Sequence, residues 1–320
     1  MKLLVTGGAG YIGSVVTHRL VEAGHRVVVL DDLSTGFADN LHPAAEFHEL
    51  PVHEADRVLG PDFDGVLHFA GKIEVAESVE HPDRYWHTNV EGTLRLLSAV
   101  RAAGTPRLIF SSTGSMYRAR EGESRLTEES YAVPGNPYAA TKLTVDMMLA
   151  GECAAFGLGA TSLRYFNAAG AVGALGERHD PESHLIPIVL QVAAGKRSEL
   201  KLYGTDYPTP DGTCIRDYIH VDDLATAHLL ALEASEPGRH EIYNLGNGNG
   251  YSNQQVLDTA RTVTGHPIPT VVAPRRPGDA AVTVASSEKA HRELNWRPAK
   301  PDLHQIIADA WEFSQNSGKL

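Results

Sequence analysis

Tyr138 and Lys142 are the two residues of this sequence best suited to moving a proton. They stand four positions apart in a stretch patterned as a helix, Tyr138-Ala139-Ala140-Thr141-Lys142, so their side chains share one helix face. A free tyrosine has a pKa near about 10 and is a weak base at neutral pH. A neighbouring ammonium favours the phenolate and lowers the phenol's pKa. Because this spacing also occurs on ordinary helix faces, its meaning depends on the rest of the chain.

Three hydroxyl residues, Ser111, Ser112 and Thr113, precede the pair by about 25 residues and end an apolar run. Open α/β sheets bind ligands at the carboxyl ends of their strands. A hydroxyl there can bond a substrate oxygen beside Tyr138 and share the moving proton. Such clusters also cap helices and turns, but the association with Tyr138 and Lys142 favours chemistry.

Glycines of GxxGxxG spacing open the chain at Gly7, Gly10 and Gly13, between a predicted strand and a predicted helix. Glycine here allows a tight turn and lets the backbone approach a pyrophosphate, while the helix N-terminus supplies amide donors. This arrangement predicts a dinucleotide site.

The next strand ends in Asp31-Asp32, nearly 20 residues beyond Gly13. A carboxylate at this distance accepts hydrogen bonds from the adenosine ribose and repels a 2′-phosphate, which favours NAD over NADP. Capping of a turn explains Asp32 better than Asp31.

Alternating strand and helix patterns in the first half predict an α/β fold, a Rossmann-type doubly wound parallel sheet. Helices are expected near 12–23, 82–103 and 137–156. In the second of these, Leu94, Leu97 and Val100 form a stripe that faces either the core or a dimer partner. The expected strands are Lys2-Thr6, Arg26-Leu30, Gly65-Phe69, Arg107-Ser111 and Thr161-Tyr165.

Glycine and proline become frequent after Phe166. We therefore expect an NAD-binding domain over 1–166 and a smaller, mixed substrate domain mainly over 167–320. A segment near 216–234 is expected to return to the first domain.

The chain's 320 residues carry a formal net charge of −12, which argues against nucleic-acid or anionic-membrane partners. The N-terminus lacks a signal-peptide pattern, and no apolar run approaches the roughly 20 residues of a membrane span. The two cysteines form no CxxC pair and the 16 histidines show no familiar ligand spacing. We therefore expect a metal-independent cytoplasmic protein with reduced thiols.

Two arginine-bearing stretches, 212–220 and 274–279, lie in the second half. Guanidinium groups suit a diphosphate through paired hydrogen bonds. Surface salt bridges explain these arginines equally well from spacing alone.

Together these motifs resemble the UDP-glucose 4-epimerase family of the extended short-chain dehydrogenase/reductases. The similarity runs nearly end to end, and its most specific stretches are Arg164-Asn167, Asp211-Val221 and Arg275-Asp279. It implies that bound NAD takes a hydride from C4 of a UDP-hexose while Tyr138 removes the 4-hydroxyl proton. The 4-keto sugar then rotates and is reduced on its other face.

The resemblance assigns catalysis to Tyr138, Lys142 and Thr113, and it implies a homodimer. It places the cofactor against Gly7, Gly10, Tyr11, Ile12, Gly13, Asp31, Asp32, Phe69, Ala70, Asn89, Ser111, Tyr138, Lys142 and Tyr165. It places the substrate against Thr113, Tyr138, Asn167, His184, Leu185, Arg216, Tyr218, Arg276 and Asp279.

Three alternatives stay open beside UDP-glucose/UDP-galactose epimerisation. The substrate could be a UDP-N-acetylhexosamine or a UDP-pentose, and the small Thr283, at a position that sets sugar size in the family, suggests room for an N-acetyl group. A 4,6-dehydratase needs an Asp-Glu pair after Thr113, where this chain has Gly114-Ser115. A catalytically silent NAD sensor has no need of the Tyr138 and Lys142 pair.

Overall fold

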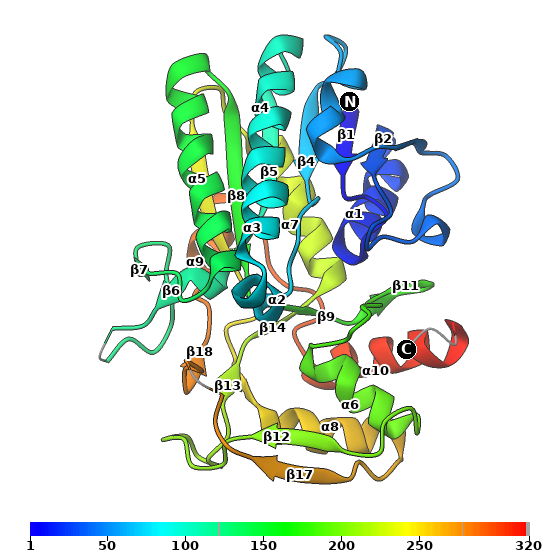
Figure 1. Cartoon of the computed structure of the whole chain (residues 1–320), viewed down its shortest axis with the longest axis vertical. Coiled ribbons are helices and arrows are strands. Elements are labelled where there is room, and N and C mark those ends of the chain that lie inside the picture. Colours follow the sequence, from blue (N-terminus) through cyan, green and yellow to red (C-terminus); the bar gives the residue numbers. More distant parts are fainter. Residues whose placement is uncertain (121, 277, 318–320) are drawn as a thin grey trace.

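A parallel β-sheet flanked by helices forms the upper part of the protein, and a smaller group of helices and short strands forms the lower part (Figure 1). This computed structural model describes residues 1–120, 122–276 and 278–317.

The central sheet runs in the order β15-β8-β5-β4-β1-β2-β3, seven strands within the described residues, and every pairing is parallel. Its inner strands are apolar runs that are buried on both faces, as a parallel sheet covered by helices requires. The bounds are β1 Lys2–Thr6, β2 Arg26–Asp31, β3 Glu46–Glu49, β4 Gly65–His68, β5 Arg107–Thr113, β8 Gly159–Tyr165 and β15 His240–Leu245.

The predicted doubly wound sheet is confirmed, with the five expected strands in place. The sequence analysis missed β3 and β15, which are the two edge strands. Their sequences, Glu46-Phe47-His48-Glu49 and His240-Glu241-Ile242-Tyr243-Asn244-Leu245, are more polar because an edge strand is less enclosed than an inner one.

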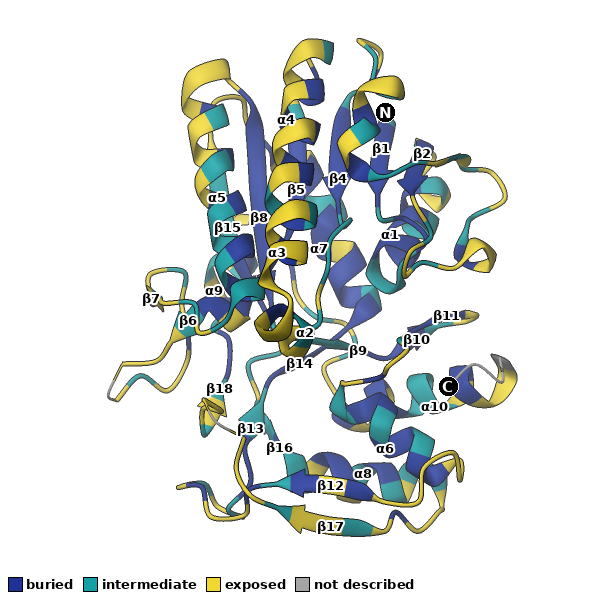
Figure 2. Ribbon diagram, viewed as in Figure 1, coloured by how far each residue is buried: buried dark blue, intermediate teal, exposed yellow. Residues whose placement is uncertain are grey.

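Helices cover both faces of this sheet. On one face α1 (Tyr11–Glu22) and α7 (Val221–Ala234) pack together over a core that includes Val16, Leu20 and Leu224. On the other face η2 (Val52–Arg57), α4 (Gly92–Ala103) and α5 (Pro137–Phe156) pack over a core that includes Leu97 and Val145. Figure 2 shows the strands as the most buried layer between the two helical layers.

The helix expected near 82–103 has a π-helical segment within it. The structure divides this stretch into α3 (Pro82–Tyr85), the π-helix η3 (Trp86–Glu91) and α4. Short π segments in α-helices are frequent at functional sites, and this one carries the buried Asn89. Of the expected stripe, Leu97 and Val100 are buried, but Leu94 is 52% exposed, so it does not belong to the core.

Segments beyond residue 166 also build the upper part. Helix α7 lies within its core, β15 extends its sheet, and the buried indole of Trp296 donates from Nε1 to the Asp223 carbonyl oxygen at 2.9 Å. Helix α7 falls within the segment near 216–234, and the division of the chain into domains stays a prediction.

The lower part has its own apolar core between α6, α8 and α10, with Val189, Leu257 and Ile306 fully enclosed. Its helices are α6 Leu185–Ala193, α8 Asn253–Thr264 and α10 Leu303–Ser317. Its paired strands are β9 Asn167–Ala169 with β14 Tyr218–His220, β10 Ala171–Val172 with β11 Leu175–Gly176, β12 Leu200–Tyr203 with β17 Thr270–Ala273, and β13 Ile215–Arg216 with both β16 Tyr251–Ser252 and β18 Val282–Thr283. The remaining elements are η1 Ala38–Asn40, α2 Val75–Glu80, η4 Gly114–Met116, β6 Tyr117–Arg118 paired with β7 Tyr131–Ala132, and α9 Glu288–Glu293.

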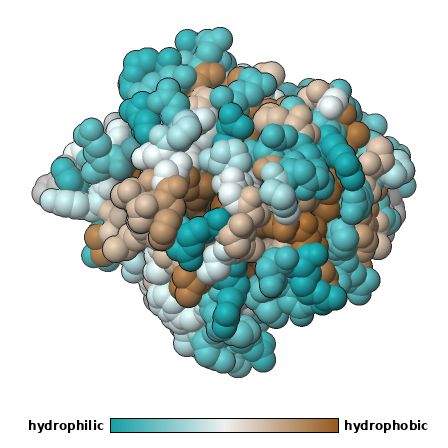
Figure 3. Space-filling view, turned by 90° about the horizontal axis from the view of Figure 1, so that it is seen from above, coloured by the Kyte–Doolittle hydropathy of each residue, from teal (hydrophilic) through white to brown (hydrophobic). Residues whose placement is uncertain are grey.

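Within the described residues, the structure has no helix with the length and apolar character that crossing a membrane requires. The face seen from above carries apolar patches interspersed with hydrophilic side chains (Figure 3).

Candidate active site

The glycine turn between β1 and α1 has no room for side chains at two of its three positions. Gly7 has φ +73°, and a Cβ there would lie 2.5 Å from the Ala70 backbone nitrogen. A Cβ on Gly13 would lie 2.2 Å from the Gly7 carbonyl oxygen. At Gly10 the nearest described atom would be that same oxygen, 3.3 Å away, with no other within 4 Å. The turn is therefore closed toward the sheet and open at Gly10, as a pyrophosphate cradle at a helix N-terminus must be.

Asp31, at the end of β2, fastens this turn. Its Oδ2 accepts from the Ala9 amide and its Oδ1 from the Leu33 amide, both at 2.9 Å. Burial raises the pKa of this carboxyl, although the two amide hydrogen bonds oppose the shift. Each oxygen keeps a lone pair that a ribose hydroxyl can use.

The neighbouring Asp32 has a local partner. Its Oδ1 accepts from the Ser34 amide at 3.0 Å and from the Ser34 hydroxyl at 2.6 Å. This is the turn cap that the sequence analysis preferred for Asp32.

Asn89 connects the loop after β4 with α5. Its Oδ1 accepts from the Lys72 amide at 2.8 Å, and its Nδ2 donates to the Lys72 carbonyl oxygen and to Oγ1 of Thr141, both at 3.0 Å. Asn89 thus positions this loop, which begins with Phe69 and Ala70. Phe69 packs against His228, with ring centres 4.8 Å apart, and Ala70 lies beside Gly7.

The expected proton-transfer residues come together at the carboxyl end of β5. Helix α5 begins at Pro137 after Asn136, whose side chain caps it by accepting from the Ala139 amide. One turn inside, Nζ of Lys142 donates to the Ser111 carbonyl oxygen at 2.9 Å. The Thr113 hydroxyl contacts Oγ of Ser115 at 2.9 Å, and hydrogen bonding from Thr113 acts to lower the pKa of the Tyr138 phenol.

Burial dominates the electrostatics of this group. It raises the pKa of Tyr138 above its usual value, the Thr113 hydrogen bond lowers it in part, and the Glu74 carboxylate raises it further. Burial also lowers the pKa of Lys142 to about 8, against an opposing effect of Asp146. The expected lowering of the phenol's pKa by Lys142 is therefore not the dominant effect among the protein's own side chains. A cationic group at the site would be needed to favour the phenolate.

The sequence analysis missed a buried polar network behind Lys142. Oδ2 of Asp146 accepts hydrogen bonds from Nε of Arg164 at 2.9 Å and from the Ser112 hydroxyl at 3.3 Å. Arg164 also donates to the Tyr117 hydroxyl at 2.7 Å. Asp146 follows Lys142 by four residues on α5, so the helix-face argument used for Tyr138 and Lys142 also points to it.

Tyr165, at the end of β8, lies close to Tyr138. Its hydroxyl hydrogen-bonds the Ser111 hydroxyl, and burial, together with the proximity of Tyr138, raises its pKa. At the start of α1, beside Ile12, Tyr11 donates from its hydroxyl to the Gly170 carbonyl oxygen at 2.7 Å. Both aromatic residues line the junction between sheet and lower part.

The candidate substrate residues Arg216 and Asp279 meet in the lower part. Nη2 of Arg216 lies 3.5 Å from Oδ1 of Asp279, and Nη1 donates to the Ala280 carbonyl oxygen at 2.8 Å. Arg276 does not join them, because its guanidinium carbon lies 4.0 Å above the Tyr203 ring centre. Pro277, in the same stretch, lies outside the described residues.

Asn167 and Tyr218 pair across β9 and β14, and Nδ2 of Asn167 donates to the Asp217 carbonyl oxygen at 2.7 Å. His184 and Leu185 mark the start of α6, where His184 contacts Glu177. Both pairs of candidate residues therefore sit on segments that link the sheet to the lower part.

Comparison with known proteins agrees with this arrangement. The family model for the NAD dependent epimerase/dehydratase family matches residues 3–246. The chain belongs to this family. Two curated relatives, each named UDP-glucose 4-epimerase, are that of Corynebacterium glutamicum, 52% identical over 320 residues, and that of Streptomyces lividans, 53% identical over 323 residues. Each alignment covers 99% of this chain and 97% of the relative.

A solved structure of another epimerase has nearly the same fold. It is that of the UDP-glucose 4-epimerase from Stenotrophomonas maltophila with bound NAD and formylated UDP-arabinopyranose, at a TM-score of 0.94 and 36% identity, covering 99% of both chains. The dinucleotide that the family uses fits the present turn, since Gly10 leaves the cradle open and Asp31 keeps free lone pairs beside it.

Proposed function

We propose that this protein is a UDP-glucose 4-epimerase that interconverts UDP-glucose and UDP-galactose with bound NAD and no net redox change. The relatives with this name align over nearly the whole chain. The observation that carries the proposal is the Lys142 contact with the Ser111 carbonyl oxygen at 2.9 Å. It brings the first turns of α5, which carry Tyr138, to the carboxyl end of β5 and Thr113, on the same sheet edge as the glycine turn.

The proton-handling part follows from these side chains. The Tyr138 phenolate accepts the proton of the sugar's 4-hydroxyl, and the Thr113 hydroxyl holds the 4-oxygen during the transfer. Lys142, fixed by the Ser111 carbonyl, would hold the cofactor's ribose. NAD, which the turn at Gly10 and the carboxylate of Asp31 would hold, would supply hydride transfer to and from C4 of the sugar. Tyr138 gives its proton back after the 4-keto sugar has turned over.

The substrate's UDP part is assigned to the lower segments. Arg216 and Arg276 would neutralise the diphosphate, and Asp279 would accept from the uridine ribose. Asn167 would hold the sugar nucleotide from β9, and His184 and Leu185 would contact it from α6. The adjacency of Arg216 and Asp279 supports this assignment.

A 4,6-dehydratase is disfavoured by packing as well as by sequence. A Cβ on Gly114 would lie 2.6 Å from the Phe166 ring. Position 114 therefore cannot carry the carboxylate that a dehydratase would need after Thr113.

The sugar itself is the finer part of the proposal. Thr283 pairs with Arg216 across β18 and β13, so its side chain lies near the proposed diphosphate site. Its small size leaves UDP-N-acetylhexosamines and UDP-pentoses as alternative substrates.

The test is to incubate the purified protein with UDP-galactose, without added cofactor, and to measure UDP-glucose by chromatography. We expect UDP-glucose to form. Absence of product with and without added NAD would refute the epimerase and favour a silent NAD sensor. UDP-N-acetylglucosamine and a UDP-pentose in parallel reactions identify the preferred sugar.

We further propose a homodimer, formed through α4 and α5. Leu94 on α4 is 52% exposed and Met147 on α5 is 69% exposed, which is unusual for large apolar side chains on adjacent helices. Light scattering should give twice the chain mass for the wild type and the single mass for a Leu94→Lys, Met147→Glu double variant. A monomeric wild type would refute the dimer.

We also propose the division into domains that the sequence pattern predicts. It consists of an NAD-binding domain over 1–166, joined by the segment near 216–234, and a substrate domain mainly over 167–320. The buried, unpaired Cys153 and Cys214 support our expectation of a reducing, cytoplasmic location.

A further inference from the structure

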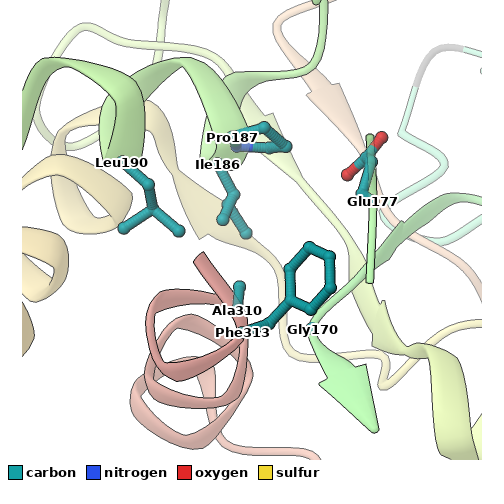
Figure 4. Close-up of a pocket in the computed structure, with 7 residues that line it drawn as sticks. All are labelled: Gly170, Glu177, Ile186, Pro187, Leu190, Ala310 and Phe313. Atoms are coloured by element: carbon teal, nitrogen blue, oxygen red, sulfur yellow. The ribbon is translucent and has the colours of Figure 1, made fainter. Parts of the chain in front are cut away.

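The segment between β11 and α6 gathers four potential metal ligands, counted among the described residues. Glu177, His179, Glu182 and His184 each offer one ligand atom, and these atoms all lie within 4.8 Å of one another. The sequence analysis named His184 only as a substrate residue and expected no metal site, because the spacing Glu-x-His-x-x-Glu-x-His is not a familiar metal motif. Glu177 stands at the edge of a small cavity, apart from the apolar side chains that line the rest of it (Figure 4).

Both imidazoles turn a nitrogen toward both carboxylates. Nδ1 of His184 lies 2.8 Å from Oε1 of Glu177 and 3.1 Å from Oε1 of Glu182. Nδ1 of His179 lies 3.2 Å from Oε1 of Glu177 and 3.9 Å from Oε2 of Glu182. The four groups therefore alternate around a common centre.

The two carboxylates of this cluster are buried. The side chains of Glu177 and Glu182 are only 8% and 2% exposed. Nδ1 of His179 is inaccessible to solvent and makes no hydrogen bond of good geometry with any described group. This nitrogen lies against two buried carboxylates without a well-formed hydrogen bond, so it is free to reorient toward an ion bound between them.

We propose that Glu177, His179, Glu182 and His184 form a binding site for one divalent transition-metal ion, for which Zn²⁺ is the natural probe. Imidazole nitrogen and carboxylate oxygen are ligands of Zn²⁺ at about 2.0–2.2 Å, which sets tetrahedral ligand atoms about 3.4 Å apart. The observed separations lie on both sides of that value, so small side-chain rotations complete the site. This proposal does not require the epimerase assignment, but it shares His184 with the proposed substrate site, using the Nδ1 side of the ring that faces Glu177.

A bound ion would link two elements of the fold. Glu177 directly follows β11, and His184 is the residue that precedes α6, so one ion would tie the two elements together. The His184 side chain is 40% exposed, which leaves its outer edge accessible when Nδ1 is bound to metal.

The experiment is calorimetric titration of Zn²⁺ into the full chain after removal of metals with a chelator. We expect about one ion per chain and a melting temperature that rises with Zn²⁺. His179→Ala should weaken binding at least tenfold, because it removes one of the four proposed ligands. Glu177→Gln, which keeps the side-chain shape, should do the same in a variant that folds readily.

His87→Ala is the matched control. His87 pairs with Glu91 at 2.8 Å on the exposed surface, so its loss should leave zinc binding unchanged. A cobalt-loaded sample should show the visible bands of tetrahedral Co²⁺ in the wild type and in His87→Ala, but not in His179→Ala. Absence of stoichiometric binding in the wild type, or equal binding in all variants, would overturn the proposal and leave the cluster as a set of ion pairs.

Discussion

The Lys142 ammonium donates to the Ser111 carbonyl oxygen at 2.9 Å, which fastens the first turns of α5 to the carboxyl end of β5. This contact joins the two motifs that the sequence places about 25 residues apart. It also means that Lys142 is buried with a single strong partner, and its pKa is lowered to about 8 as a result of burial.

Replacing Lys142 with Met should therefore separate stability from activity. Below pH 8 the wild type holds a buried charge, so Lys142→Met should raise the free energy of unfolding by about 1–2 kcal/mol at pH 7 while abolishing most turnover. Between pH 8 and about 10.5 the unfolded chain binds this proton and the folded chain does not, so wild-type stability rises with pH and the variant's advantage shrinks. Urea unfolding at pH 7 and pH 9.5 measures this, with the exposed Lys201→Met as control. An advantage that grows with pH would contradict the assignment.

Removing the phenol hydroxyl should abolish chemistry but keep the cofactor. Tyr138→Phe retains the ring packing on α5, and proton transfer by a positioned side chain contributes typically 10²- to 10⁴-fold to a rate. We expect a loss of that order in turnover of UDP-galactose with NAD content unchanged, measured by releasing the cofactor from denatured protein. Near-normal activity would show that another group is the base.

A methyl group at Gly13 should displace the turn that holds the cofactor. Its Cβ would meet the Gly7 carbonyl oxygen at 2.2 Å, and backbone cannot yield as a flexible side chain can. We expect Gly13→Ala to lower NAD content at least tenfold. Gly151→Ala, within α5, has no described atom within 4 Å of the new Cβ and should leave NAD content unchanged while stabilising the protein by about 1 kcal/mol. Equal NAD content in both variants would disprove a role for the turn.

Much of this fold could be predicted because several of its elements are encoded by short stretches of neighbouring residues. The apolar runs of β1 and β5 and the glycine spacing each depend on neighbouring residues, and both the strands and the turn are found where expected. Edge strand β15 was missed because its sequence is more polar than those of the inner strands, and its partner β8 lies about 80 positions away in the chain.

Contacts across the fold account for the missed parts of the site. The hydrogen bonds of Asn89 to Lys72 and Thr141, for example, depend on a π-helical segment that no propensity reveals. Within α5 the step from Lys142 to Asp146 was accessible to sequence reasoning, whereas the Arg164 partner on β8 was not.

Asp217 should couple pH to the stability of the proposed substrate segment. Its oxygens accept from the amides of Asn247, Gly248 and Ala285 at 2.9–3.1 Å, and burial raises its pKa to about 6. Between pH 4 and about pH 6 the folded chain therefore holds a proton that the unfolded chain has lost. This group alone makes stability fall with rising pH, by at most roughly 1.4 kcal/mol per pH unit.

Asp217→Asn removes that slope and places an amide NH₂ against backbone donors. We expect the free energy of unfolding to fall by about 2–3 kcal/mol near pH 4.5, and this difference from the wild type to narrow toward pH 7. We also expect a raised KM for UDP-galactose, because the Asp217 carbonyl holds Asn167 and the neighbouring Arg216 is the proposed diphosphate ligand. Urea unfolding at four pH values and steady-state kinetics measure the two effects. Asp62→Asn, an exposed change on the far surface, is the control and should alter neither the slope nor KM. A difference between Asp217→Asn and the wild type that stays constant from pH 4.5 to pH 7 would show that Asp217 is ionised throughout this range.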